Sequence, residues 1–318
     1  SRVVLFAGKS EDALARHRPR GLLRVRTVDH VPTVEAQAAS IVGMRIGLIA
    51  TPWTPVPPAL YGGIELVVDR LATGFQRAGH DVLLFTTGES TCPVPKAWVL
   101  EQAEGQRIGS VVPELRHVMA AYEAVEGCDV VHDHTVMGPA YAESHAGMPV
   151  VTTIHGEFNA EMHEIYARIT RRVPLIAISH AQRKPAPDIP IARVIHHGLD
   201  AEDFPFGEGE GGYCLFLGRM SPDKGAHRAI EAAKKAGVRL LMAAKMREAW
   251  EFEYFDANVK PHLSEEIQYL GEVPHEQKLE LLAGARALLF PIRWNEPFGM
   301  VMIEALACGT PVLAFPEG

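Results

Sequence analysis

Two carboxylates near the end of the chain flank residues that the sequence pattern places at the start of a helix. Glu296 follows the predicted strand ALLFPI, and Glu304 falls in about the second turn of the helix predicted over 298–308. A carboxylate beside an anion can accept hydrogen bonds from sugar hydroxyls, and a second one can bind a ribose. The alternative is an ordinary helix whose acidic first turn is favoured by the helix dipole. The first N–H groups of the helix lack an acceptor within it and can bind an anion; they belong to Gly299, Met300 and Val301.

Two cations lie beside another predicted helix start. Arg219 and Lys224, in GRMSPDKG, follow a buried strand and flank the beginning of the helix predicted over 222–236. Fixed cations beside free helix-terminal N–H groups form a site for a diphosphate. The alternative is a pair of solvated surface charges, which contribute little energy. Because the pair stands at a strand-to-helix junction, we favour the diphosphate site.

Glycines and histidines mark further strand ends. Gly62 and Gly63, in YGGIE, precede a helix, and their missing Cβ atoms let a ligand approach the backbone. A simple turn explains them equally well, since no dinucleotide or P-loop fingerprint is present. His132 and His134 alternate on one predicted strand, and His155 ends the next, where we expect it to face a cleft. Without H-E-x-x-H or Cys/His spacing, we predict hydrogen-bonding roles and no metal site.

The order of predicted elements indicates two doubly wound α/β domains in tandem. We predict a non-structural leader or mis-assigned start over 1–43, a first domain over 44–199, a Gly- and acid-rich linker over 200–212, and a second domain over 213–318. Strands that alternate with helices are typical of parallel sheets covered on both faces. Two such domains leave a cleft between their strand carboxyl ends, where this architecture binds ligands. In the first domain the predicted strands are 44–51, 81–87, 129–134, 149–155, 174–179 and 193–198.

Composition excludes several classes of function. A net charge of −8 and the lack of a basic, aromatic-rich stretch predict no nucleic-acid partner. The four cysteines are far apart and form no C-x-x-C pair, which indicates reduced thiols and a cytoplasmic location. No uncharged apolar run approaches the roughly 18 residues that a membrane-spanning helix needs.

Taken together, the motifs resemble those of one enzyme family. EPFGMVMIE, in which seven residues separate two glutamates, is similar to the signature of retaining family 4 glycosyltransferases (glycosyltransferase group 1) with the GT-B fold. YGGIE, FLGRMSPDKG and EALACGTPVLA agree with the family in order, and HDHT, TIHG and VIHHGLD resemble its intermediate landmarks. The resemblance covers most of 44–318. The chain departs from the pattern in LLMAAKM, which lacks a frequent glycine, and in HHG, where Asn-Gly is more usual.

The resemblance implies a role for each matching residue. Arg219 and Lys224 would bind the diphosphate of a nucleotide-sugar donor and offset the charge on the departing nucleotide. Glu296 would contact the donor sugar, Glu304 would hold the ribose, and His155 would lie beside the transferred sugar. Backbone contacts around sugar, phosphate and acceptor would come from Gly62, Gly63, Phe298, Gly299, Met300 and Val301.

The resemblance also implies a metal-independent front-face transfer, in which the leaving phosphate helps to deprotonate the acceptor. The D-x-D triplet of metal-dependent glycosyltransferases does not occur, and no cofactor is expected. The expected donor is a UDP-sugar such as UDP-glucose rather than GDP-mannose. The acceptor, whether small molecule, saccharide or lipid, is left open, and so is a peripheral association with membranes.

Other interpretations stay open at this point. The family continues beyond the last residues here with more α/β units and a terminal helix, so the resemblance implies an interrupted second domain. One alternative function is a pair of domains that binds a nucleotide-sugar without turnover. Another is a different GT-B enzyme, such as a sugar-nucleotide epimerase, which the motif order favours less.

Overall fold

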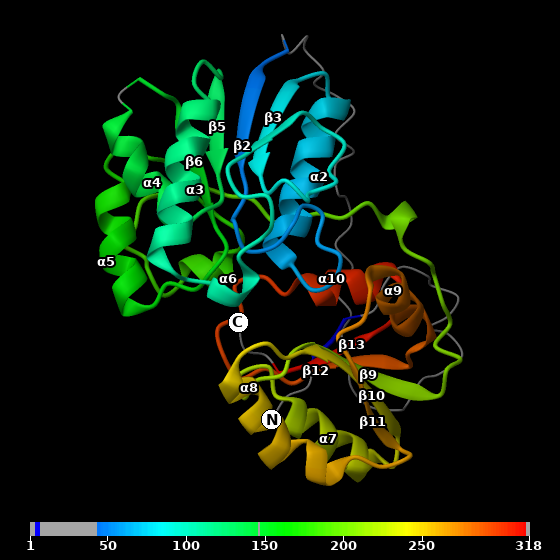
Figure 1. Ribbon diagram of the computed structural model, residues 1–318. Coiled ribbons are helices and arrows are strands. Elements are labelled where there is room, and N and C mark those ends of the chain that lie inside the picture. The colour runs from blue at the N-terminus through cyan, green and yellow to red at the C-terminus, as the bar shows by residue number, and fades with distance from the viewer. Residues whose placement is uncertain (1–3, 7–42, 146, 316–318) are drawn as a thin grey trace.

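The computed structural model describes residues 4–6, 43–145 and 147–315, which form two α/β domains, one above the other in Figure 1. The first domain is built on a seven-stranded sheet in the order β4-β3-β2-β5-β6-β7-β8. Every neighbouring pair in it is parallel. Its strands are β2 (Arg45–Ile49), β3 (Asp81–Thr86), β4 (Lys96–Trp98), β5 (Val130–Asp133), β6 (Val150–Ile154), β7 (Leu175–Ala177) and β8 (Ile191–Val194).

Helices cover both faces of this sheet because successive strand residues point to opposite sides. Ile46 and Leu48 of β2 pack in one cluster with Val68 of α2. Ile49 packs in another cluster with Tyr122 of α3. The helices of this domain are α2 (Gly63–Arg77), α3 (Val111–Ala124), α4 (Gly138–Tyr141), α5 (Ala160–Ile169) and α6 (His180–Arg183).

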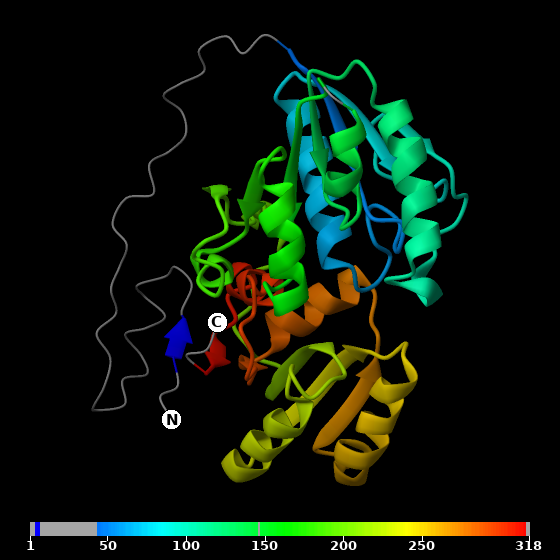
Figure 2. The ribbon, with the colours of Figure 1, turned by 90° about the vertical axis from the view of Figure 1, so that its left-hand side faces the viewer.

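The second domain has a sheet in the order β1-β13-β12-β9-β10-β11, with β9 to β13 parallel. Phe216 of β9 packs with α7, whereas its neighbours Leu215 and Leu217 pack with α9 and α10. In both views α9 and α10 lie toward the first domain and α7 lies away from it (Figures 1 and 2). The elements are β9 (Tyr213–Arg219), α7 (Ala226–Ala236), β10 (Arg239–Lys245), α8 (Ala249–Asn258), β11 (Ile267–Gly271), α9 (His275–Gly284), β12 (Ala287–Phe290), α10 (Met300–Ala307) and β13 (Val312–Ala314).

The α/β class predicted from the sequence, with parallel sheets, is confirmed, while one predicted strand is corrected and one strand was missed. The strand predicted over 193–198 is β8 at Ile191–Val194, because the chain leaves the sheet before His196 and His197 and carries both to the cleft. The short edge strand β4 was not predicted, since three half-exposed residues carry little periodicity.

Part of the predicted leader is also corrected. Val4–Phe6 form strand β1, which pairs antiparallel with β13 from Val4↔Ala314 to Phe6↔Val312. Without this partner β13 would present unpaired backbone groups at the edge of the described sheet. Residues 1–3 and 7–42 of that predicted leader lie outside the described residues.

The predicted linker 200–212 is attached to the second domain by its backbone. The N–H groups of Gly207, Gly209 and Gly211 donate to carbonyls at the ends of α9 and α10 over 3.0, 3.4 and 2.9 Å. The connection therefore lies along the second domain and does not hang free between the two.

Within the ranges that the structure describes, no helix has both the length and the apolar character needed to cross a bilayer.

Candidate functional site

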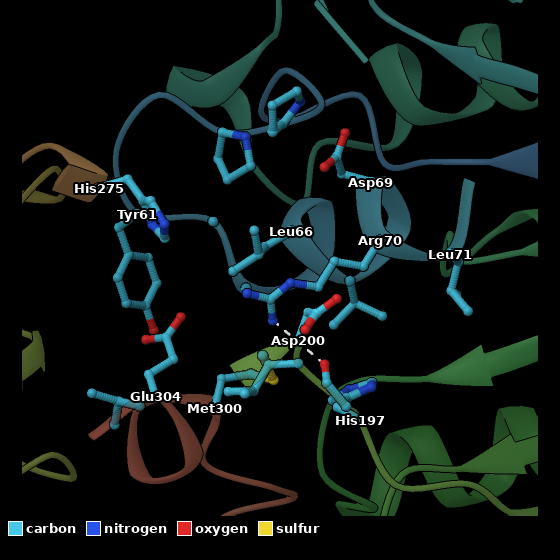
Figure 3. Close-up of a pocket in the computed structure, with 18 of the residues that line it drawn as sticks. Tyr61, Leu66, Asp69, Arg70, Leu71, His197, Asp200, His275, Met300 and Glu304 are labelled. Atoms are coloured by element: carbon cyan, nitrogen blue, oxygen red, sulfur yellow. Dashed lines mark hydrogen bonds between the residues drawn. The ribbon is translucent and has the colours of Figure 1, made fainter. Parts of the chain in front are cut away.

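A cleft of about 1610 Å³ lies between the two domains and is lined by both. Its walls are the loop after β2 and the helix α2 on one side, and residues that follow β9, β10, β11 and β12 on the other. Figure 3 shows part of this lining. Among the residues singled out from the sequence, those that line it are Gly62, Gly63, His132, Lys224, Glu296, Gly299, Met300, Val301 and Glu304. His155, Arg219 and Phe298 are not part of the lining.

An ion pair between Lys224 and Glu296 stands in the cleft wall. The Lys224 ammonium donates to Oε2 of Glu296, and the two side chains are only 13% and 14% exposed. The ammonium also lies 4.6 Å from the centre of the Trp294 ring, whose face attracts cations. Because both charges are largely removed from water, each needs the other or a ligand as compensation. An anion could therefore bind the ammonium while a hydroxyl group donates to the carboxylate.

The backbone at Gly225 fixes the position of Lys224. Gly225 has φ +79 and is the N-cap of α7, so the helix begins at Ala226 and not at 222 as predicted. A Cβ at this position would lie 2.6 Å from the carbonyl oxygen of Pro291, in the segment that leads to Glu296. Only glycine combines this φ with such a close approach. The two segments that carry the ion pair are therefore in direct backbone contact.

We expect Gly225→Ala to destabilise the protein by about 2 kcal/mol, because it adds left-handed backbone strain. The displaced Pro291 carbonyl adds to this effect. Urea unfolding followed by circular dichroism measures the change. Gly74→Ala, in the middle of α2 with nothing within 4 Å of the added Cβ, is the control. It should stabilise by about 0.5–1 kcal/mol. Equal stability of Gly225→Ala and wild type would contradict the argument.

Helix α10 presents its N-terminus and one carboxylate to the cleft. Gly299 is its N-cap with φ +82, and no side chain caps the first N–H groups. Glu304 is 4% exposed, and its Oε1 accepts a hydrogen bond of 2.8 Å from Nζ of Lys278 in α9. Lys278, which also lines the cleft, was missed from the sequence, because a lysine in an amphipathic helix gives no signal of its target.

Arg219 lies at the end of β9 among acidic side chains. Its guanidinium is 3.6 Å from Asp223 and 3.8 Å from Glu251, and 5.7 Å from the centre of the Trp250 ring. The Glu251 side chain is fully buried and also accepts from the N–H of Arg247, which lies just before α8. Arg219 is therefore next to two carboxylates, and its direct contact with a diphosphate stays a prediction.

Tyr61 crosses from the first domain to the second, a contact that the sequence did not indicate. Its N–H donates to Oε1 of Glu272 over 3.0 Å, and Lys245 Nζ lies 5.4 Å from its ring centre. Its side chain extends toward Glu304 (Figure 3). Tyr61 keeps 43% of its surface exposed, yet desolvation by the surrounding protein, with the nearby Glu296 carboxylate, raises its pKa to about 12. The phenol is thus a neutral hydrogen-bonding group in the lining of the cleft.

The loop that precedes α10 is held by the first domain. The Ser179 hydroxyl donates to the carbonyl of Pro297 and accepts from the N–H of Gln182 at 2.8 Å. The Phe298 ring lies 4.9 Å from the ring of His197, centre to centre. Phe298 therefore contacts the first domain in addition to ending the loop that carries Glu296.

A row of imidazoles continues from His197 into the first domain. The His155 ring stacks on His197 at 5.4 Å, His155 Nε2 lies 2.9 Å from Nδ1 of His134, and His134 is 4.1 Å from His132, ring to ring. Burial lowers the pKa of His155 to about 3 and that of His132 to about 4. Burial also lowers the pKa values of His134 and His197, so all four imidazoles stay neutral near pH 7. Within the described residues, no three His, Cys, Asp or Glu side chains could hold a metal ion.

We expect the stability of the protein to fall as the pH drops below about 6.5, the ordinary histidine pKa. The unfolded chain binds protons there, whereas the folded histidines stay neutral until their lowered pKa values are reached. His117 is fully buried, and burial lowers its pKa to about 4. It alone contributes about 1.4 kcal/mol per pH unit in this window. Thermal unfolding between pH 8 and 5 measures the effect, and His117→Gln should reduce the slope. A midpoint that does not change over this range would contradict the prediction.

Comparisons with known families match both domains of the chain. The model of Glycosyltransferase Family 4 matches residues 61–203. The model of Glycosyl transferases group 1 matches residues 201–318. The two matches meet in the segment predicted as the linker, and each carries one wall of the cleft.

Individual relatives agree with these matches. Glycogen synthase of Mycobacterium tuberculosis is 26% identical, with 85% of this chain and 77% of the relative covered. Phosphatidyl-myo-inositol mannosyltransferase of Mycolicibacterium smegmatis is also 26% identical, covering 85% and 76%. Among solved structures, the glycosyltransferase AviGT4 of avilamycin A biosynthesis is 27% identical with a TM-score of 0.63, covering 86% and 80%. Sucrose-phosphate synthase of Thermosynechococcus elongatus shares the fold, with 18% identity, a TM-score of 0.71 and 86% and 82% covered.

Proposed function

Because the chain belongs to the family 4 and group 1 glycosyltransferases and has their GT-B fold, we propose that it is a retaining hexosyltransferase. It moves a hexosyl group from a nucleotide-sugar donor to a hydroxyl acceptor. The proposal rests above all on one observation, the largely buried Lys224–Glu296 pair beside the uncapped start of α10. At this place the ammonium and the free N–H groups would bind an anion, and the adjacent carboxylate would bind a sugar.

The electrostatics of this arrangement suit the departure of a nucleoside diphosphate. Breaking the anomeric C–O bond places negative charge on the diphosphate and positive character on the sugar ring. Lys224, Arg219 and the start of α10 would stabilise the negative charge on the diphosphate. Electrostatic stabilisation of this kind is usually the largest contribution in such sites. Glu296 would accept hydrogen bonds from the sugar hydroxyls. When the diphosphate takes the Lys224 ammonium, the Glu296 carboxylate is released for the sugar.

The remaining residues complete the donor site in this proposal. Glu304, oriented by Lys278, accepts from the ribose hydroxyls. Gly62 and Gly63 border phosphate and acceptor: the Cβ position of Gly63 faces open space, whereas a Cβ at Gly62 would lie 2.7 Å from Pro58, so Gly62 lets the preceding loop pack against the start of α2. His155 lies beside the transferred sugar. Backbone groups around the phosphate and sugar come from Phe298, Gly299, Met300 and Val301.

The donor is a UDP-sugar, with UDP-glucose as the first choice over GDP-mannose. Transfer needs no metal, since the cations of the site take the charge that a metal would neutralise elsewhere. The acceptor is a small molecule, a saccharide or a lipid, and a lipid acceptor would bring the protein to the membrane surface. The cysteines are all buried and unpaired, which fits a cytoplasmic location.

A donor screen tests the function directly. UDP-glucose, other UDP-sugars and GDP-mannose are tested by calorimetry for binding and by mass spectrometry for release or transfer of the sugar, with and without EDTA. Binding of one nucleotide-sugar with turnover in EDTA is expected. Binding without turnover would favour a nucleotide-sugar-binding protein, and loss of turnover in EDTA would contradict metal independence. Proton NMR of the first product establishes whether the anomeric configuration is retained.

A further inference from the structure

The backbone around His155 is held from both sides by one buried amide. Gln182, which is 1% exposed, donates from Nε2 to the carbonyls of Ile154 and Gly156 over 2.8 and 2.7 Å. Its Oε1 accepts from the N–H of Ile178. The residues before and after His155 are therefore fixed, and only the ring of His155 needs a further contact to be oriented.

That contact comes from His134. Nδ1 of His134 lies 2.9 Å from Nε2 of His155, and His134 is 3% exposed. Burial lowers the pKa of both imidazoles far below neutrality. Two neutral imidazoles can share one hydrogen bond only if one ring donates and the other accepts. The direction of this bond decides which nitrogen of His155 carries its proton.

The second nitrogen of His134 indicates the direction. Its Nε2 is buried and has no hydrogen-bond partner among the described residues. If His155 donated, this Nε2 would carry a buried N–H without an acceptor, and orphaned buried N–H groups are rare. If His134 donates from Nδ1, its Nε2 keeps only an unshared electron pair. His155 then carries its own proton on Nδ1, which has no partner within the described residues and is not fully buried.

We propose that His134 is a positioning residue that holds His155 as the Nδ1–H tautomer, so that this N–H is available to an oxygen of the donor sugar next to His197, the neighbouring imidazole that lines the cleft. The site of the ligand contact rests on the proposed function, whereas the tautomer does not. Stacking of His155 on His197, with an angle of 16° between the rings, keeps the ring from turning. His134 itself touches no substrate and acts only through His155.

Long-range proton–nitrogen NMR spectra of protein labelled in its histidine rings test the tautomer without any donor. The His155 signals are assigned by their loss in His155→Gln. In the wild type at pH 7 we expect His155 to be protonated at Nδ1. His134→Leu removes the donor, so the His155 signals should shift toward the Nε2–H form. His134→Asn keeps a side-chain N–H near the position of Nδ1 and should retain the wild-type pattern.

Kinetics supply the second measurement. His134→Leu should lower kcat by about 10-fold to 100-fold with little change in the KM of the donor, the effect of a misplaced group in the reacting geometry. His134→Asn should recover most of the rate. His262→Asn, an exposed histidine on the second domain, is the control and should match the wild type.

The outcomes separate the tautomer assignment from the proposed function. Wild-type His155 protonated at Nε2, or unchanged His155 signals in a folded His134→Leu, would overturn the inference. If His134→Leu fails to fold, the wild-type spectrum and His134→Asn still decide it. Absence of sugar transfer by the wild type with every donor would count against the proposed function and leave the tautomer assignment intact.

Discussion

Glu296→Gln lowers the rate of sugar transfer by about 100-fold or more and changes donor affinity much less. The substitution keeps the shape of the side chain and removes its charge. A neutral amide is a weaker acceptor for the sugar hydroxyls, which become more acidic as positive character develops in the ring. It also leaves the Lys224 ammonium without the carboxylate that now pairs with it. Since the loss falls mainly on the transition state, kcat should decrease more than binding.

The measurements are kcat from initial rates at saturating donor and Kd from calorimetry. Glu276→Gln is the matched control, because Glu276 is an exposed glutamate in the first turn of α9. It should behave as the wild type in both assays. A rate of Glu296→Gln within twofold of the wild type would remove Glu296 from the site assignment.

Lys224→Met lowers kcat/KM by about 100-fold to 1000-fold, the usual effect of removing one group aimed at developing negative charge. Both donor affinity and rate should fall, because the ammonium contacts the diphosphate before and after the bond breaks. Methionine has nearly the length of the lysine stem, so packing changes little, while the contact of the ammonium with the Trp294 ring is lost with the charge. The remaining Glu296 carboxylate becomes an unpaired charge in a largely buried position and would repel the incoming diphosphate.

The control for this variant is Lys260→Met. Lys260 pairs with Asp256 on the surface, with side chains 63% and 59% exposed, and such pairs contribute little. The double variant of Lys224→Met and Glu296→Gln should lose less than the product of the two single losses, since the residues act as a pair. Independent losses, or wild-type affinity in Lys224→Met, would count against the pair as the centre of the donor site.

The sequence determined the architecture because the signals for it are local. Buried strands such as YCLFLGR and the apolar spacing in IELVVDRLATGF follow from the geometry of strand and helix, whatever the rest of the chain does. The same holds for residues at strand ends. Parallel strands place their carboxyl ends at one edge of a sheet, so Gly62, Lys224, Glu296 and Glu304 could be assigned to one cleft before any contact was known.

Tertiary structure alone decided which of these groups touch. Tyr61 meets Glu272 across 211 positions of sequence, and Ser179 meets Pro297 across 118. No local pattern encodes such pairs, because they depend on how two separately folded domains face each other. The cleft lining also left out Arg219, which ends β9, and His155, which directly follows β6. Acidic side chains hold Arg219 and imidazoles hold His155, and these neighbours come from other parts of the chain.

The histidines also show what the sequence indicates and what only the packed structure decides. Spacing indicated that His132 and His134 share one strand face and that hydrogen bonding is their role, which the contacts with Thr153 and His155 confirm. It could not indicate that burial makes these rings neutral, nor that His134 meets His155. Desolvation and ring-to-ring geometry are properties of the packed molecule, since they depend on which side chains exclude water from each ring. Alternation of residues along the chain thus determined the two sheets and the position of the cleft, and packing between distant segments decided its chemistry.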